Sequence, residues 1–353
     1  MAFLQIKNVA ISGIAASVPE NTISNSDYPF ANERERDLFI KSTGIEQRRI
    51  IDQAYTAADL CAQAALKLMK DMQLKHSDIK LLIFVTQTPD YITPATAVKL
   101  QHELGLNEDC LAFDINLGCS GYVYGLSVAA SLLSNIPNPE AKALLLVGDT
   151  SSACISEADK STAPLFSDAG SATVLNKSEG EHMDFLMSSD GSGYESIIIP
   201  DGGYRNPFSE SSLEMKEESE GINRNATHLI LKGIDIFNFS VKRVPAQINE
   251  LLNLENKKVE DVNYYVFHQA NKLINDTIAK KLKLSRDQAP LSLKKFGNTS
   301  SASIPITMVY CLRAVLSENK ATDLILSGFG VGLSWASVYL KTKKLYCPKL
   351  VEV

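Results

Sequence analysis

The sequence predicts a layered α/β protein, built from two similar halves, in which helices pack between two sheets. The apolar runs at 80–86 and 142–147 are of the kind that is buried on both faces of a sheet. KLLIFVTQT lies about half the chain away from NYYVFHQAN, and DINLGCSG and LLLVGD are similarly offset from KKFGNTSS and LILSGF. This internal duplication favours an α-β-α-β-α arrangement, with one half over 1–178 and the other over 179–353.

In the first half, apolar runs predict the strands and a 3.6-residue periodicity predicts the helices. The strand at 111–115 is apolar except for one acid, and we expect it to be buried. The helix that begins at 94 opens on proline, which suits a first turn. We expect strands at 3–14, 80–86, 111–115, 142–147 and 166–175. We expect helices within 25–41, at 56–72, at 94–104 and from 120 onward.

The second half repeats this order, with strands expected at 264–267 and 323–327 and helices at 271–282 and 304–316. Before it lies the segment 201–224, DGGYRNPFSESSLEMKEESEGINR, which is acidic and low in apolar residues. A stretch of this length without a periodicity of its own is either a functional flap or a disordered insertion. The sequence leaves both open.

Composition narrows the class of protein. The 353 residues are 45% hydrophobic and 22% charged, and the net charge of −6 argues against nucleic-acid binding. No apolar run is long enough for a membrane helix, and no basic lead precedes the N-terminal apolar residues, so we expect neither a membrane segment nor a signal peptide. The six cysteines form no CxxC and no paired spacing, which predicts reduced thiols and a cytoplasmic location.

The stretch LAFDINLGCSGYVYGLSVAAS predicts a strand, a tight turn and a helix, with Cys119 at the first turn of the helix. There the thiol would face unpaired backbone N–H groups and the positive end of the helix dipole. Such sites lower a cysteine pKa from about 8.5, so we expect a nucleophile. A buried structural cysteine is the alternative.

The internal duplication relates two further side chains of the second half to positions in the first half. His268 directly follows the apolar strand YYVF, and Asn298 lies in a Gly-flanked turn. By the duplication, Asn298 corresponds to Cys119, and the loop of His268 corresponds to that of Thr88. If the halves pack about a pseudo-twofold axis, the three turns meet at one cleft. A satisfied core imidazole and a conformational asparagine are the alternatives.

The segments DINLGCSGYVYGL, YYVFHQANKLI, FGNTSSASIP and GFGVGLSWAS resemble four signatures of the β-ketoacyl-ACP synthase III type condensing enzymes, as do STGIEQRRI and FSDAGSATVL. The resemblance covers nearly the full chain. It implies a thiolase-like fold, a homodimer, and no cofactor or metal. It also implies that Cys119 accepts an acyl group from a thioester, and that His268 and Asn298 bind the carbonyl of malonyl-ACP as it loses CO2. The backbone N–H groups of Cys119 and Gly332 would form an oxyanion hole.

The sequence departs from this family where acyl-CoA binds. Leu38 and Ser42 stand where relatives carry a Trp and an Arg beside the adenine, and Cys154 stands near a second CoA-site arginine. Without these groups, adenine stacking and phosphate pairing weaken. An acyl-ACP or a specialised acyl donor is therefore expected rather than acetyl-CoA. Thr93 aligns with the residue that the family sends across the dimer into the partner's acyl pocket.

Basic residues gather on and after the helix that follows HQAN. They are Lys272, Lys280, Lys281, Lys283 and Arg286. In the family this face docks the acidic acyl carrier protein, and a solvated basic helix end is the alternative.

Two other functions remain open from the sequence. One is an acyltransferase on the same fold that passes the acyl group of Cys119 to an oxygen or nitrogen nucleophile. The other is a non-catalytic partner subunit. The intact His268–Asn298 pair favours decarboxylative condensation, and the retained Cys119 argues against a non-catalytic subunit.

Overall fold

Two long antiparallel strands, β1 (Ala2–Val18) and β7 (Ala169–Ser189), run through the molecule and connect its halves. The first part of β7 pairs with β6 (Lys142–Asp149) and its last part with β14 (Ser334–Thr342). This computed structural model describes residues 1–52 and 54–353. Within the described residues, β7 passes without a break through position 178, so the predicted division of the chain falls inside one strand and stays a prediction.

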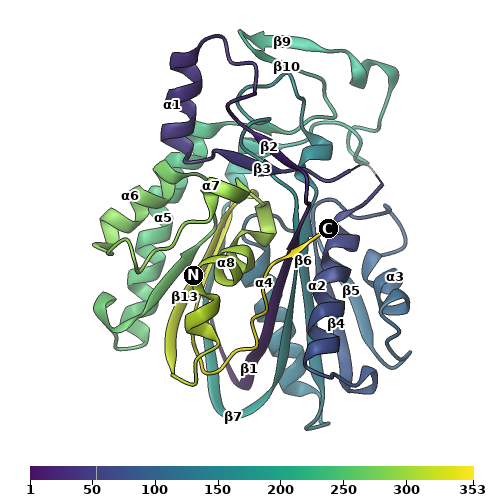
Figure 1. The fold of residues 1–353 in the computed structure, drawn as a ribbon, viewed down its shortest axis with the longest axis vertical. Helices are drawn as coiled ribbons and strands as arrows, with labels where there is room; N and C mark the ends of the chain where they lie inside the picture. The colour runs from purple at the N-terminus through teal and green to yellow at the C-terminus, as the bar shows by residue number, and fades with distance from the viewer. Residues whose placement is uncertain (53) are drawn as a thin grey trace.

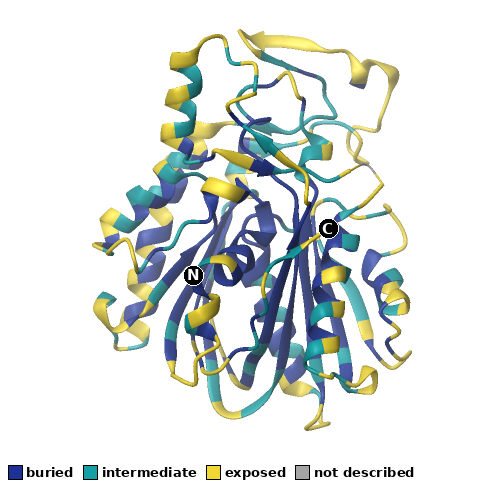
Figure 2. Cartoon of the chain, viewed as in Figure 1, coloured by how far each residue is buried: buried dark blue, intermediate teal, exposed yellow. Residues whose placement is uncertain are grey.

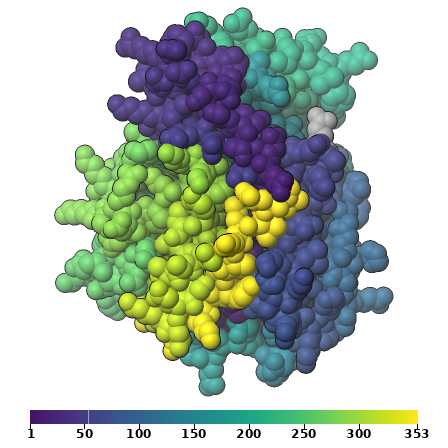
Figure 3. Space-filling view, viewed as in Figure 1, coloured from purple at the N-terminus to yellow at the C-terminus, as the bar shows by residue number. Residues whose placement is uncertain are grey.

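The main sheet is mixed and has the order β12-β13-β14-β7-β6-β4-β5, with β1 beside β7 and β15 beside β1. Its remaining strands are β4 (Ile79–Val85), β5 (Leu111–Ile115), β12 (Tyr264–Phe267), β13 (Thr322–Gly330) and β15 (Val351–Glu352). In the space-filling view the C-terminal segment lies along the seam between the halves (Figure 3), where β15 pairs with β1.

The helices form one central layer and two outer layers, and the strands lie between them (Figure 1). The larger helices are α2 (Ala57–Asp71), α3 (Thr96–Glu103), α4 (Gly121–Asn135), α5 (Gly233–Leu254), α6 (Lys272–Leu282) and α8 (Ser303–Leu316). Helices α4 and α8 share one core with inward-facing residues of both ends of the sheet, whereas α2 with α3 and α5 with α6 each cover an outer face. The strands and the two central helices are largely buried (Figure 2). The predicted α-β-α-β-α fold is confirmed.

Capping residues explain several helix starts. Thr56 forms a capping box with Asp59 at the start of α2, and the side chain of Asn271 caps α6. Helix α3 begins at Thr96 rather than at the predicted proline. The carboxylate of Asp114 accepts the backbone N–H groups of Thr96 and Ala97 at 2.6 and 2.7 Å, so the single acid of β5 caps the neighbouring helix.

Strand β5 lies where predicted, but the prediction that it is buried is wrong. It forms the edge of the sheet and pairs on one side only, with β4. Its residues are half-buried or exposed, and the side chain of Leu111 is exposed.

The segment 201–224 contains a short hairpin of β9 (Lys216–Ser219) and β10 (Ile222–Arg224). The buried Arg224 fixes this hairpin, since its guanidinium pairs with Asp159 at 3.0 Å and with Glu218. For residues 216–224 the alternative of a disordered insertion is therefore wrong, and the flap stays a prediction. Together with α1 (Glu33–Thr43), β2 (Thr22–Ser24) and β3 (Gln47–Arg49), the hairpin forms a cap at one end of the molecule (Figure 1).

None of the helices in the described part of the chain combines the length and the apolar character needed to cross a membrane. All six cysteines lie in that part and carry free thiols, as expected.

Candidate active site around Cys119

Cys119 lies in the turn between β5 and α4, one residue before the N-cap Ser120. The turn is closed by a hydrogen bond from the Gly121 N–H to the Gly118 carbonyl at 2.6 Å. Glycine at 330 lets the strand end approach the thiol closely, because a Cβ there would lie 2.5 Å from the Cys119 Cβ and 2.7 Å from its Sγ. The sulfur is therefore held in a narrow space between two backbone segments.

Burial raises the pKa of the Cys119 thiol to about 11, so the prediction of a lowered pKa is wrong. The N–H groups of Val331 and of Cys119 itself, and the hydroxyl of Ser300, favour the thiolate. Burial outweighs them, and the buried Asp149 carboxylate raises the pKa further. The Cys119 thiol is thus neutral at neutral pH.

His268 follows β12, and its backbone N–H donates to the Ser327 carbonyl at 2.8 Å. Its imidazole Nδ1 lies 2.7 Å from the Ser303 hydroxyl, and the ring packs edge-on against Phe329. Burial lowers the pKa of His268 to about 3, against a smaller opposite effect of the Ser300 backbone. The imidazole is therefore neutral.

Asn298 is fixed by its own turn. Its Oδ1 accepts the Ser300 N–H at 2.9 Å, which assigns the orientation of the amide and leaves Nδ2 as the group that can donate. Nδ2 makes only a long contact of 3.4 Å with the Ala270 carbonyl. The preceding Gly297 has φ 56°, and a Cβ there would lie 2.9 Å from Ser167 Oγ. The turn thus requires glycine beside asparagine.

The structure brings the three predicted side chains together. Cys119, His268 and Asn298 line one small cavity of about 50 Å³, together with Phe329 and Gly330. The sulfur therefore shares a space with two neutral hydrogen-bonding side chains. Such donors suit a substrate carbonyl that gains negative charge.

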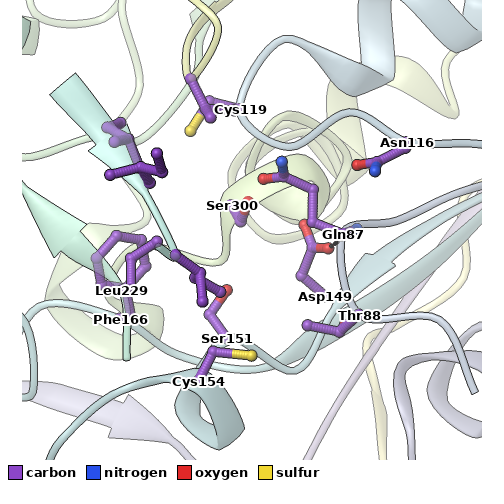
Figure 4. Close-up of a pocket in the computed structure, with 14 residues that line it drawn as sticks. Gln87, Thr88, Asn116, Cys119, Asp149, Ser151, Cys154, Phe166, Leu229 and Ser300 are labelled. Carbon is purple, nitrogen blue, oxygen red and sulfur yellow. Dashed lines mark hydrogen bonds between the residues drawn. The ribbon is translucent and has the colours of Figure 1, made fainter. Parts of the chain in front are cut away.

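Cys119 also lines a second, larger cavity of about 210 Å³ (Figure 4). Its sulfur points into this cavity, and Cys154 lies toward the other end in this view. The wall is part apolar and part polar, and its residues are Gln87, Thr88, Asn116, Cys119, Asp149, Ser151, Cys154, Phe166, Ile197, Ile198, Ile199, Leu229, Ser300 and Val331. The cavity leaves space beside the Cys119 sulfur for a group bonded to it.

Asp149 is a functional candidate that the sequence reasoning missed. This buried residue ends β6, and its carboxylate accepts the Gln87 N–H at 2.7 Å, the Ser301 N–H at 3.1 Å and the Ser301 hydroxyl at 2.6 Å. Burial raises the pKa of Asp149. The signal was an acid at the end of an apolar strand, in LLLVGD. The Asp149 carboxylate joins the loop after β4 to the turn that carries Asn298.

The remaining predicted positions lie elsewhere. The backbone N–H that favours the Cys119 thiolate belongs to Val331, and Gly332 lines neither cavity, so the oxyanion role of Gly332 stays a prediction. Thr93, Leu38 and Ser42 are exposed.

The five basic residues do not act alike. Lys272 pairs with Asp276, and the Lys281 ammonium donates to the Val241 carbonyl at 2.8 Å. The other three line a cavity of about 390 Å³ at the end of α6: Lys280, Lys283 and Arg286.

Comparison with known proteins agrees with this geometry. A family model described as 3-oxoacyl-[acyl-carrier-protein (ACP)] synthase III matches residues 113–191, and a model of its C terminal matches 252–342. The chain is 31% identical over 335 residues to the beta-ketoacyl-[acyl-carrier-protein] synthase III of Streptococcus gordonii, covering 94% of this chain and 99% of that protein. It is 33% identical over 333 residues to the Streptococcus mutans protein of the same description, covering 94% of this chain and 98% of that protein. The crystal structure of a 3-oxoacyl-(acyl-carrier protein) synthase from Burkholderia xenovorans superposes with a TM-score of 0.92 at 35% identity, covering 100% of this chain and 99% of that one.

Proposed function

Because the chain belongs to the 3-oxoacyl-[acyl-carrier-protein] synthase III family of condensing enzymes, we propose that it forms a β-ketoacyl-ACP in two steps at Cys119. An acyl group first moves from a thioester to the sulfur. The acyl-enzyme then condenses with malonyl-ACP, which loses CO2. The cavity that Cys119 shares with His268 and Asn298 is the observation that carries this proposal.

In the first step the Cys119 sulfur attacks the thioester carbonyl, and the thiol proton leaves with the departing thiol. The backbone N–H groups of Cys119 and Val331 face the Cys119 sulfur and would hold the oxyanion that forms beside it. Since the resting thiol is neutral, proton loss accompanies attack.

In the second step the neutral imidazole of His268 and the amide of Asn298 donate to the malonyl thioester carbonyl. When the Ser303 hydroxyl, 2.7 Å away, donates to Nδ1, the proton of the neutral His268 lies on Nε2. Loss of CO2 leaves an enolate, which these two donors stabilise. The enolate carbon then attacks the acyl carbonyl on Cys119, and the thiolate leaves and regains a proton.

We further propose an acyl-ACP or a specialised acyl thioester as the donor, rather than acetyl-CoA. Leu38 and Ser42 are exposed and offer neither a planar ring nor a cation for the adenine and phosphates, and Cys154 is uncharged at the far side of the cavity. A cytoplasmic location and the absence of a cofactor are part of the same proposal.

The intact mass of the protein tests the donor and the first step. Each of a panel of acyl-CoA and acyl-ACP thioesters is incubated with the protein, and the mass increase is mapped by peptide analysis. An adduct on Cys119 from acyl-ACP in preference to acetyl-CoA is expected. Malonyl-ACP is then added. If no CO2 is released and the acyl group appears on an alcohol or amine, the alternative of an O- or N-acyltransferase replaces this proposal.

We propose a homodimer that closes the sheet edge at β5. This edge strand exposes Leu111, and the nearby loop exposes Tyr91 and Ile92. Thr93 is exposed in that loop and would reach the acyl pocket of the partner subunit. Sedimentation measures the dimer. Thr93→Phe is expected to shift the donor preference toward shorter acyl chains without changing the oligomeric state.

We propose that the carrier protein docks on the basic groove of Lys280, Lys283 and Arg286. Acidic partners favour a surface where several cations are free of internal partners. Lys280→Glu combined with Lys283→Glu is expected to raise KM for malonyl-ACP while leaving acylation by small thioesters unchanged. Lys281→Gln is the matched control, because its ammonium is bound to α5.

A further inference from the structure

A second group of reactive side chains lies on the outer face of the sheet. His182 and Asp184 are two residues apart on β7 and therefore point to the same face. Glu255 ends α5, which packs on this face. One ligand atom from each of the three lies within 4.8 Å of the others. None of them lines the Cys119 cavities.

Asp184 is the unusual member of the group. Its side chain is 0% exposed, and neither carboxylate oxygen has a hydrogen-bond partner among the described residues. The nearby Lys257 ammonium pairs with Asp323 at 3.1 Å, and the Tyr339 hydroxyl also donates to Asp323. Nε2 of His182, 3.2 Å from Oδ2, is the basic group beside this buried carboxylate, and it is charged only when protonated, so the position calls for a further positive partner.

The spacing of the group fits one metal ion. Nε2 of His182 lies 3.2 Å from Oδ2 of Asp184 and 3.9 Å from Oε2 of Glu255. Two ligands of one Zn²⁺, each bonded at about 2.0–2.2 Å, lie roughly 3.0–3.5 Å apart. The His182–Asp184 pair has this spacing. The Glu255 carboxylate lies farther from His182, and a small side-chain movement would bring it within the same range. An imidazole and two carboxylates, with open positions for water, suit a divalent transition metal.

We propose that His182, Asp184 and Glu255 bind one divalent transition metal ion of the Zn²⁺ type, which joins β7 to the end of α5. The ion supplies the positive charge that the buried Asp184 lacks.

Calorimetric titration of the chelator-treated full chain with Zn²⁺ tests this site, in a Cys119→Ser background that removes the cavity thiol. One ion per chain is expected. Asp184→Asn and His182→Gln should each weaken Zn²⁺ binding by about tenfold or more, whereas His102→Gln, which changes an exposed histidine elsewhere, should not. Zn²⁺ should raise Tm of the parent protein and not of the two variants.

Folding of the variants is checked in the same experiment. Without metal, Asp184→Asn is expected to be at least as stable as the parent, because it removes an unpaired buried charge. His182 is partly exposed, so His182→Gln provides an independent folded variant. Absence of Zn²⁺ binding to the parent overturns the proposal, and so does equal binding to all variants.

Discussion

The turns before the two central helices occupy corresponding places in the two halves, yet they hold their side chains in opposite ways. The turn before α4 holds Cys119 as a neutral thiol, in a space kept open by Gly118 and Gly330. The turn before α8 locks Asn298, because the Ser300 N–H binds its Oδ1. In the proposed reaction, one turn provides room for the attacking sulfur, and the other fixes the Asn298 amide as a hydrogen-bond donor.

This difference predicts that the two half-reactions can be lost separately. Cys119→Ala is expected to abolish the acyl adduct and to lower condensation by roughly 10⁴-fold or more. Release of CO2 from malonyl-ACP should persist, because the His268–Asn298 side is intact. Intact mass and CO2 release measure the two steps. Cys154→Ala, in the same cavity, should keep the adduct. An adduct that survives Cys119→Ala would remove the assigned nucleophile.

The opposite turn should give the reverse pattern. Asn298→Ala is expected to keep the acyl adduct and to slow CO2 release and condensation by about 10²–10³-fold, the usual effect of one lost oxyanion donor. Asn298→Asp keeps the acceptor for the Ser300 N–H but replaces the donor, so it should be equally impaired. Full activity in Asn298→Asp would show that the turn needs only the acceptor.

The room around the sulfur can be tested by a single methyl group. Gly330→Ala places a Cβ 2.5 Å from the Cys119 Cβ and 2.7 Å from its Sγ. The displaced sulfur should acylate about 10²-fold more slowly, as measured by stopped-flow mass analysis. Gly203→Ala is the control, since its Cβ would meet nothing within 4 Å. Unchanged acylation in Gly330→Ala would mean that the space is not limiting.

Asp149 joins the loop beside the Cys119 turn to the Asn298 turn, so its loss should affect both turns alike. In the variant Asp149→Asn, an amide would face the backbone N–H groups of Gln87 and Ser301, which now donate to a carboxylate. We expect a loss of about 1–3 kcal/mol in the free energy of unfolding, measured in urea, and similar slowing of both half-reactions. The exposed Asp287→Asn is the control. Slowing of only one step would show that Asp149 serves one turn.

Periodicity and strand composition predicted the layers because buried apolar faces leave a pattern in the sequence. Helix α2 and strands β5 and β12 lie within a residue of their expected ranges. The edge position of β5 was not predictable, since pairing order depends on contacts distant in sequence. The hairpin at 216–224 was missed for the same reason, because Arg224 is held by the distant Asp159.

At the site, the sequence predicted which side chains meet but not their protonation. The duplication placed Cys119, His268 and Asn298 together, and they share a cavity. The N–H groups at the helix terminus predicted a lowered pKa for Cys119, but burial has the larger effect on that pKa and raises it. Burial is set by Gly330 and Val331, which approach from the far end of the chain.

Cys119 and His268 should make the free energy of unfolding fall at opposite ends of the pH range. The folded protein holds the pKa of His268 at about 3, below its ordinary value of about 6.5. The unfolded chain therefore binds the extra proton first, and stability through His268 falls as pH drops below about 6.5. For Cys119 the folded pKa of about 11 lies above the ordinary value. The unfolded chain loses that proton first, so stability falls as pH rises past about 8.5.

Thermal unfolding of matched variants isolates each contribution. Relative to the parent, His268→Gln should gain Tm as pH falls from about 7 to about 5, and Cys119→Ser should gain Tm as pH rises from about 8 to about 10, each with the slope of a single ionisation. His102→Gln is the control for an exposed histidine. Cys154→Ser measures the contribution of the second thiol of the cavity, whose pKa burial also raises. If the Tm of Cys119→Ser minus that of the parent instead shrinks as pH rises, the sulfur of the folded parent is a thiolate. The Cys119 turn would then activate its thiol, as the helix terminus predicted, while the Asn298 turn holds its amide in place.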